Sequence, residues 1–164
     1  MYTPTKTAIQ RPDEKPHAMM FSLKAPYMEQ GRVTQLVAKT PNLRIHTKVN
    51  AEGGENEIHT HLDEDHSFVV LEGQMSVFDE QGNEMVVMPH QGVLLPKGAF
   101  YRYLNTGQGN LVVLRIGTGF ADTPEGGAAK RVSTAGHEIR EGTAENKWLE
   151  PIEVPGKFFA NEAG

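Results

Sequence analysis

The sequence predicts an all-β protein, and three observations lead to that prediction. Between Gly31 and about residue 117, short runs rich in Val, Ile, Leu and Phe alternate with turn residues. The runs have the length of strands and follow one another at even spacing. No long stretch shows the 3.6-residue apolar period of a helix. Together these features are typical of a β-sandwich or β-barrel.

Nine strands are expected in chain order, each bounded by turn residues. The first two are separated by Thr40-Pro41-Asn42, Gln81-Gly82-Asn83 has the composition of a hairpin turn, and Pro96-Lys97-Gly98 ends the seventh run. The expected strands cover residues 32–39, 43–49, 57–61, 67–71, 75–78, 84–88, 92–95, 100–104 and 111–116.

The two ends of the chain have a different composition from the β region at 31–117. Residues 1–30 begin with three prolines within 16 residues, which predicts an N-terminal arm and lead-in. Residues 118–164 are interrupted by glycines but keep large apolar groups, among them Trp148, Phe158 and Phe159. A disordered tail rarely keeps such groups, so we expect an extended segment that packs on the barrel or on a partner subunit.

Composition excludes several classes of function. With 164 residues the chain is expected to form one domain, and without cysteine it has neither a disulfide framework nor a thiolate metal site. A net charge of −5 and the lack of a Lys/Arg cluster argue against nucleic acid as a partner. No apolar run has the length of a membrane span or a signal peptide, which predicts a cytoplasmic protein without membrane contact.

Three of the seven histidines stand within eight residues, at His59, His61 and His66. A spacing of two places the first two rings on the same face of a strand, with Cα atoms about 6.6 Å apart. A turn through Asp63-Glu64-Asp65 would let the next strand return His66 to the same place. Neutral imidazole is the commonest ligand of divalent transition metals, so the cluster predicts a metal site with open positions. The acidic turn itself is expected to be solvated.

The spacing around this cluster resembles the first motif of the cupin family. Gly53 is followed after five residues by His59-Thr60-His61, His66 stands four residues on, and Gly73 six residues beyond it. The second motif is matched by Pro96-Lys97-Gly98, Tyr101 and Asn105. Two positions depart from the family pattern, because His66 stands in place of a glutamate and Tyr101 in place of a histidine.

The resemblance implies a jelly-roll barrel, also called a double-stranded β-helix, with a metal held by His59, His61 and His66. It implies a divalent transition metal, with Fe(II) favoured and Mn, Ni, Zn or Cu as alternatives. It also suggests an oxygenase or dioxygenase reaction on a small polar or anionic molecule. Three neutral ligands would leave the full charge of the metal in the site, which favours an anionic substrate. Cupins commonly form dimers, so a homodimer is expected.

Tyr101 has three interpretations at this stage. It could bind the metal as phenolate, stay neutral and hydrogen-bond to substrate or dioxygen as a catalytic group, or simply fill the barrel. Tyr103 shares its parity and should line the same wall. On the strand at 43–49, the apolar set is expected inside, which places His46 outside. Arg115 is a candidate clamp for a substrate carboxylate.

Three other functions compete with the oxygenase hypothesis. A non-oxidative isomerase or decarboxylase could use the same metal site. A non-catalytic binding or sensing module would explain the two altered motif positions as a lost active site. A metal-free sugar-nucleotide epimerase would leave the three clustered histidines unexplained.

Overall fold

The computed structural model describes residues 7–118, 131–139 and 149–161. Within these ranges the chain forms strands and turns only, so the predicted all-β class is confirmed. No helix in the described part is long and apolar enough to cross a membrane. The strands are β1 (Ala8–Ile9), β2 (Ala25–Gln30), β3 (Arg32–Thr40), β4 (Leu43–Asn50), β5 (Gly54–His61), β6 (Asp65–Glu72), β7 (Met75–Phe78), β8 (Glu84–Val87), β9 (Gly92–Leu95), β10 (Tyr101–Asn105), β11 (Leu111–Thr118), β12 (Arg131–Ser133) and β13 (Ile152–Phe159).

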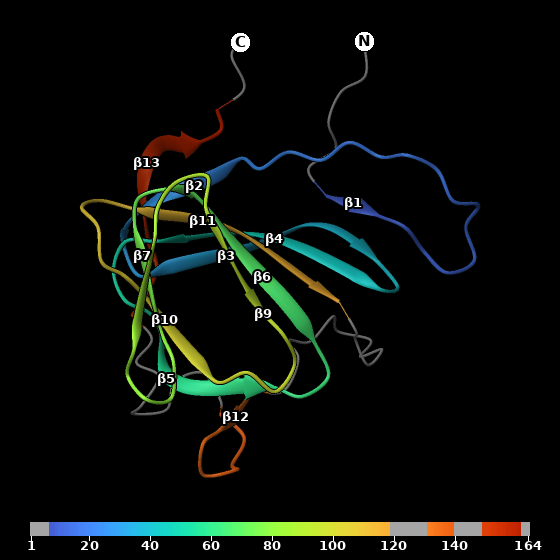
Figure 1. Ribbon diagram of the computed structural model, residues 1–164. Coiled ribbons are helices and arrows are strands. Elements are labelled where there is room, and N and C mark those ends of the chain that lie inside the picture. Colours follow the sequence, from blue (N-terminus) through green and yellow to red (C-terminus); the bar gives the residue numbers. More distant parts are fainter. Residues whose placement is uncertain (1–6, 119–130, 140–148, 162–164) are drawn as a thin grey trace.

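Two sheets surround a common interior (Figure 1). One has the order β1-β3-β4-β11-β6-β9 and the other the order β12-β5-β10-β7-β8. Their inward residues form a core with Phe68 and Val70 from one sheet and Met75, Val77 and Tyr103 from the other. These side chains fill the barrel interior, as the parity of Phe68 and Val70 with His66 predicted.

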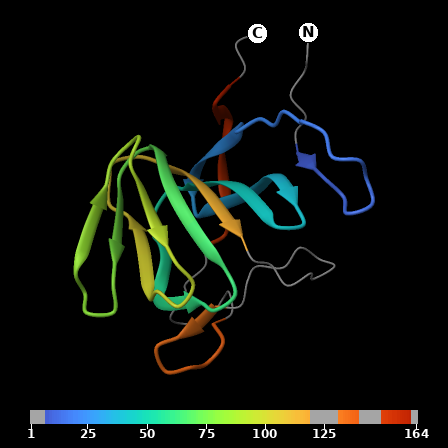
Figure 2. The same ribbon diagram turned by 45° about the vertical axis from the view of Figure 1, so that its right-hand side comes forward.

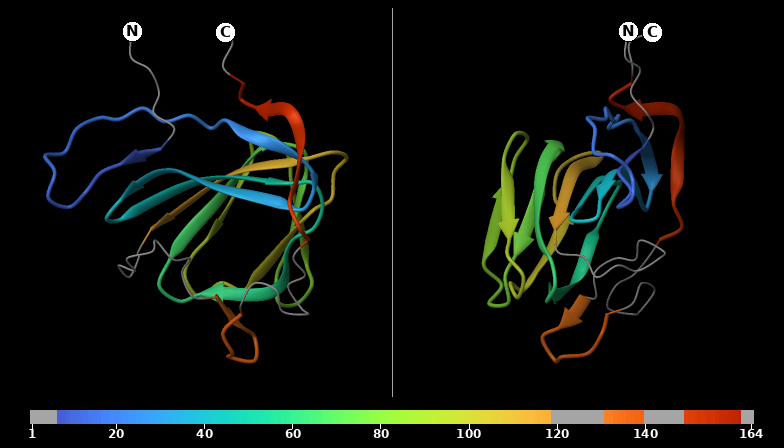
Figure 3. Two further views of the ribbon diagram at one scale, coloured as in Figure 1. Left: turned by 180° about the vertical axis from the view of Figure 1, so that it is seen from behind. Right: turned by 90° about the vertical axis from the view of Figure 1, so that its right-hand side faces the viewer.

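A third, two-stranded sheet made of β2 and β13 covers the outside of the larger sheet. It lies on the side away from β7 and β8 (Figure 3, right). Ala25 and Met28 of β2 pack against Val49 of β4 and Val112 of β11, and Phe159 of β13 borders this second core. Both faces of β4 and β11 are therefore buried.

This double burial explains why the expected orientation of His46 is wrong. The odd-numbered, mostly apolar side chains of β4 do face a core, as expected. This core is the outer one under β2, and Val49 is buried in it. Arg44, His46 and Lys48 consequently point into the barrel, where Lys48 Nζ lies 5.6 Å from the ring centre of Phe68. The alternation of residues along one strand shows which side chains share a face. It does not show whether the second face contacts another core or solvent.

The segments on either side of residues 31–117 contact the barrel in two ways. β1 pairs in parallel with β3, whereas β2 and β13 pair with each other in an antiparallel manner and pack on the barrel through side chains. β12 pairs with β5, and its hairpin projects below that strand in Figure 2. The predicted division at residues 30 and 117 stays a prediction, and Trp148 lies outside the described residues.

The outer core gives a test of stability that does not touch the interior site. Met28 is 2% exposed whereas Met85 on β8 is 49% exposed. We expect Met28→Ala to lower the free energy of unfolding by about 2–5 kcal/mol because it leaves a cavity over β4. Met85→Ala should change it by less than about 0.5 kcal/mol. Urea denaturation of both variants measures the difference, and equal effects would contradict the assignment of a second core.

Candidate functional site

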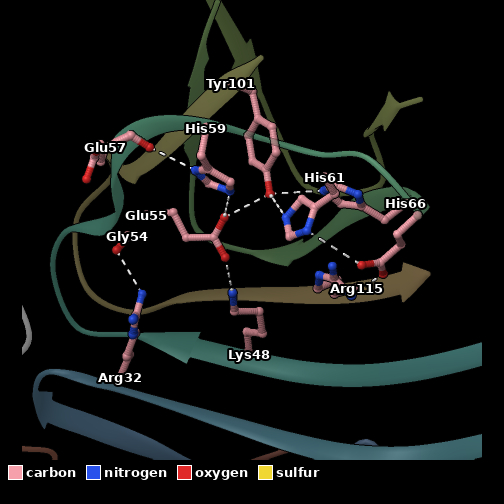
Figure 4. Close-up of polar contacts among 11 residues, drawn as sticks. Arg32, Lys48, Gly54, Glu55, Glu57, His59, His61, His66, Tyr101 and Arg115 are labelled. Carbon is pink, nitrogen blue, oxygen red and sulfur yellow. Dashed lines mark hydrogen bonds and ion pairs between the residues drawn. The ribbon is translucent and has the colours of Figure 1, made fainter. Parts of the chain in front are cut away.

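The three clustered histidines and Tyr101 come together inside the barrel (Figure 4). Strand register places Tyr101 of β10 opposite His59 of β5, and their ring centres are 4.5 Å apart. His66 begins β6 across the interior, with its ring centre 4.7 Å from that of His61. All four residues are at most 4% exposed. The juxtaposition predicted from the motif spacing is therefore present, while the roles of these residues remain predictions.

The hydroxyl of Tyr101 is the point on which this cluster converges. His66 Nε2 lies 3.0 Å from Tyr101 Oη, and His61 Nε2 lies 3.4 Å from it. The hydroxyl donates its proton to Glu55 Oε2 at 2.8 Å. Because the single phenol proton goes to Glu55, a hydrogen bond between either imidazole and Tyr101 Oη must be donated by a ring N–H.

Glu55 is a member of the site that the sequence did not reveal. It shares odd-numbered parity with His59 and His61, but it precedes the strand expected at residues 57–61. In the structure β5 already begins at Gly54, and its register against β10 shifts between the pairs Tyr101–His59 and Tyr103–Glu55. Glu55 pairs opposite the buried Tyr103, and its carboxylate lies inside the barrel.

Lys48 holds this carboxylate from the opposite sheet. Its Nζ lies 2.9 Å from Glu55 Oε1, and both side chains are less than 10% exposed. The ammonium also lies 5.2 Å from the ring centre of Tyr103. Such a buried pair is costly to break, because removal of one partner leaves the other charge uncompensated.

The orientation of His59 is fixed by a main-chain carbonyl. His59 Nδ1 lies 2.8 Å from the carbonyl oxygen of Glu57, and because that oxygen can only accept, Nδ1 carries the proton. His59 Nε2 then faces Glu55 Oε2 at 3.1 Å. Carbonyl contacts of this kind commonly orient histidines that bind metals.

The acidic turn is not uniformly solvated, which corrects the sequence expectation. Asp65 is exposed and accepts a hydrogen bond from the backbone of Lys97, but Glu64 is only 1% exposed. Its carboxylate forms an ion pair with Arg115 Nη1 at 2.8 Å and lies 3.7 Å from His61 Nδ1. A side chain at Gly117 would overlap this carboxylate, so the glycine makes room for it. Arg115 therefore faces inward and is paired with Glu64.

Burial and neighbouring charges set the protonation states in the site. Burial, together with the charge of Arg115, lowers the pKa of His61 and of His66 to about 3, so both rings are neutral near pH 7. Burial and the charge of Glu55 raise the pKa of Tyr101 well above its usual range. Burial opposes the ionisation of Glu55, yet Lys48 and His59 hold its pKa well below the usual range. In the absence of a metal, Tyr101 is a neutral donor to a carboxylate.

The contacts of Tyr101 Oη have the separations that two ligands of one metal ion have. In the described part of the chain, no three His, Asp or Glu side chains alone are arranged to hold a metal ion. Ligands about 2.1 Å from a metal lie about 3.0–3.4 Å from one another. The distances from Tyr101 Oη to His66 Nε2 and His61 Nε2 are 3.0 and 3.4 Å. Nitrogen and oxygen donors without thiolate match the first-row transition metals that the sequence predicted.

Comparison with known families agrees with this architecture. Residues 46–117 match the family described as "Cupin domain", so this part of the chain is a cupin domain. The match spans β5, β6 and β10, which carry the histidine cluster and Tyr101. Cupins commonly bind metal ions, and the family includes enzymes. No curated protein shows significant sequence similarity to the chain.

Solved structures with the same fold have low sequence identity to this chain. TT1209 from Thermus thermophilus is 19% identical, with 58% of this chain and 90% of that chain covered and a TM-score of 0.52. KdgF from Halomonas sp. is 21% identical, with coverage of 56% and 82% and a TM-score of 0.51. A cupin-superfamily sugar phosphate isomerase from Silicibacter pomeroyi is 19% identical, with coverage of 71% and 83% and a TM-score of 0.50. These likenesses establish the fold.

The inward position of His46 makes stability depend on pH. Burial and the charges of Arg115, Lys48 and Arg44 lower its pKa from 6.5 to about 4. Between these values the unfolded chain binds a proton that the folded chain does not, so acid favours unfolding. We expect His46→Gln to remove a loss of up to about 1.4 kcal/mol per pH unit between pH 6.5 and 4.

Denaturant unfolding with chelator at pH 7.5 and 5.0 measures this effect. The advantage of His46→Gln over the parent should grow as the pH falls. The same substitution at the exposed His17 should leave the pH dependence of the parent unchanged. A constant difference between His46→Gln and the parent would show that His46 is not kept neutral by its surroundings.

Proposed function

We propose that this chain is a metal-dependent cupin enzyme that acts on a small anionic molecule. The observation that carries the proposal is the convergence of His61 Nε2 and His66 Nε2 on Tyr101 Oη, at 3.4 and 3.0 Å. His59 adds a third buried ring, and the carbonyl of Glu57 turns its Nε2 toward the same region. A neutral ring, which in one of its two tautomers can present a lone pair to the site, is the form of histidine that binds a metal.

A divalent metal held by these residues would act as a Lewis acid on an acidic group of the substrate. The chain itself supplies the orientation and the proton. The carbonyl oxygen of Glu57 orients His59, while burial keeps His61 and His66 unprotonated. Tyr101 holds a proton at Oη next to the donors, in the position of a general acid.

The charges around the site support an anionic substrate. Three neutral imidazoles do not cancel the charge of a divalent ion. The carboxylate of Glu55 is offset by Lys48 at 2.9 Å, and that of Glu64 by Arg115 at 2.8 Å. Neither acid therefore neutralises a bound metal. A carboxylate or enolate oxygen on the substrate would supply the missing negative charge.

The Fe(II) oxygenase chemistry expected from the sequence is one form of this proposal. The second is a non-oxidative isomerisation or decarboxylation, and a specific observation favours it. Tyr101, Glu55 and Lys48 form a hydrogen-bonded chain next to the donors, with contacts of 2.8 and 2.9 Å. Such a chain can deliver or accept a proton at a substrate carbon or oxygen without an oxidant.

Metal content is the first test. Protein purified without chelator should contain about one divalent metal per chain. The double variant His59→Ala/His61→Ala should contain at least about tenfold less, because it removes two donors. His17→Ala is the matched control, since His17 is exposed and its Nδ1 lies 3.2 Å from the backbone carbonyl oxygen of Lys15. Elemental analysis and competition with a chromophoric chelator give the occupancy and the affinity.

Two results would contradict the metal proposal. One is a parent protein without stoichiometric metal, which would favour the non-catalytic binding module. The other is equal metal content in the parent and the double histidine variant.

The role of Tyr101 can be read from absorption spectra. If its phenolate binds the metal, iron-loaded and oxidised protein should show a visible charge-transfer band that Tyr101→Phe abolishes. If the phenol is a neutral proton donor, both proteins should have the same spectrum and Tyr101→Phe should lower kcat by about 10²–10⁴-fold. A variant with the parent spectrum and the parent kcat would leave Tyr101 a packing residue only.

Substrate assays separate the two reaction classes. Oxygen uptake with keto acids, catechols or thiols would support oxygenation. Exchange of a substrate C–H for deuterium in D₂O under anaerobic conditions would support the non-oxidative reaction. Tyr101→Phe should slow either reaction more than Tyr103→Phe, because the hydroxyl of Tyr103 has no hydrogen-bond partner among the described residues.

A further inference from the structure

We propose that two copies of this chain associate through β8, so that their five-stranded sheets join into one continuous sheet. The proposal does not depend on the metal site. β8 is the last strand of its sheet and, among the described residues, pairs only with β7. It stands at the end of the molecule away from β2 and β13 (Figure 3, right).

Exposed apolar side chains gather on this edge strand. Met85 and Val86 are each 49% exposed, and Met88 just beyond the strand is 44% exposed. Proteins usually protect a free edge strand with several charges, a proline or a bulge. β8 has Glu84 as its one charged residue, contains no proline, and pairs with β7 without a register shift. The edge is therefore suited to accept another strand.

The turn that precedes β8 shows which of its backbone groups face outward. In an antiparallel ladder, alternate residues direct their N–H and C=O groups to opposite sides. Asp79 N donates to Asn83 O at 3.1 Å, and this pair continues the register of β7 with β8. Odd-numbered residues of the two strands therefore bond each other. Glu84 and Val86 consequently direct their N–H and C=O groups to the open edge.

The neighbouring contacts agree with this alternation. Thr106 N donates to Gln74 O at 3.2 Å and continues the register of β10 with β7, so even-numbered residues of β7 face β10. The odd-numbered ones are left for β8. Met88 uses both of its backbone groups in the following turn, with the amide and side chain of Gln91. The open edge of β8 therefore ends at Val86.

The outward groups fit a second copy of the same strand about a two-fold axis at Met85. In this antiparallel register Glu84 lies opposite Val86 of the second copy, and each such pair exchanges two hydrogen bonds. All outward N–H and C=O groups of Glu84 and Val86 are then used. Each carboxylate lies opposite an apolar side chain and not opposite the other carboxylate, so the register avoids direct repulsion of like charges.

β9 ends the six-stranded sheet and is the less suitable strand for such a pairing. Val70 N donates to Gln91 O in line with the register of β6 and β9, which makes Gly92 and Leu94 the outward residues. Leu94 is 71% exposed, but Gly92 has no side chain that a partner strand could pack against. We therefore assign the contact to β8.

The concentration dependence of the mass gives the first test. One strand pair buries less than the roughly 800 Å² per partner of a standard interface, so we expect a reversible dimer with a Kd on the order of 10 µM. Sedimentation velocity or light scattering from about 1 to about 300 µM should follow the change from monomer to dimer.

Charge substitutions test the register. Val86→Glu should raise the Kd at least about tenfold, because two carboxylates then lie opposite each other at both symmetric positions. The exchange Glu84→Lys/Val86→Glu places opposite charges in the same two pairs and should bring the Kd back to within about threefold of the parent. Ile152→Glu is the matched control, since Ile152 on β13 is 45% exposed at the other end of the molecule, and it should leave the Kd unchanged.

A proline substitution tests the backbone contacts. Val86→Pro removes an N–H that points away from β7, which an edge strand tolerates, so the variant should fold with a parent-like circular dichroism spectrum. It should nevertheless stay monomeric at about ten times the parent Kd, because each symmetric pair loses a hydrogen bond and meets the proline ring.

A disulfide can trap the proposed contact, because the chain has no cysteine of its own. Residues at position 85 would face each other as a non-hydrogen-bonded pair with Cα atoms about 4.5 Å apart, which is within the range that a disulfide spans. Met85→Cys should therefore form a covalent dimer on mild oxidation, seen by non-reducing electrophoresis. Ile152→Cys should form it at least about tenfold more slowly.

Two results would overturn the proposal. One is a parent protein that stays monomeric over the whole concentration range. The other is a dimer that Val86→Glu and Val86→Pro leave unchanged and that Met85→Cys does not trap, because another surface would then hold it. Neither result bears on the proposed function, which is tested by metal content.

Discussion

The ion pair between Lys48 and Glu55 is the interaction on which the interior of this barrel depends. It joins the two large sheets across the interior at 2.9 Å, with both partners withdrawn from water. Desolvation of two charges is costly, and here the cost is offset by close contact and by the hydrogen bond that Tyr101 donates to the same carboxylate. The position of Glu55 in turn decides where the hydroxyl of Tyr101 lies.

A second constraint comes from the outside of the barrel. Because β2 and β13 cover β4 and β11, the apolar side chains of β4 are used on its outer face. The barrel interior is left to a polar row that includes His46 and Lys48. The cover strands β2 and β13 thus bury the apolar side chains on the outer face of β4 and β11. Because this outer core contributes to stability, the inner face of β4 can carry polar side chains.

The site follows the cupin plan but differs in its polar neighbours. Tyr101 stands where the family pattern has a histidine, and burial and Glu55 raise the pKa of its hydroxyl, so it is a neutral proton donor. Glu64, buried beside His61, is held by Arg115. Beside the two departures from the family pattern, the interior holds two buried acids, each paired with a basic side chain.

The sequence by itself determined the all-β class, the strands between residues 31 and 117 and the grouping of His59, His61, His66 and Tyr101. Local turns, strand parity and fixed motif spacing are encoded within short stretches, so these features can be read without coordinates. The tertiary structure decided what that local pattern left open. The start of β5 at Gly54 brought Glu55 into the strand opposite Tyr103, and the cover of β2 turned His46 and Lys48 inward. These side-chain orientations depend on which strands and sheets pack together, and the residues of a single strand do not specify its neighbours.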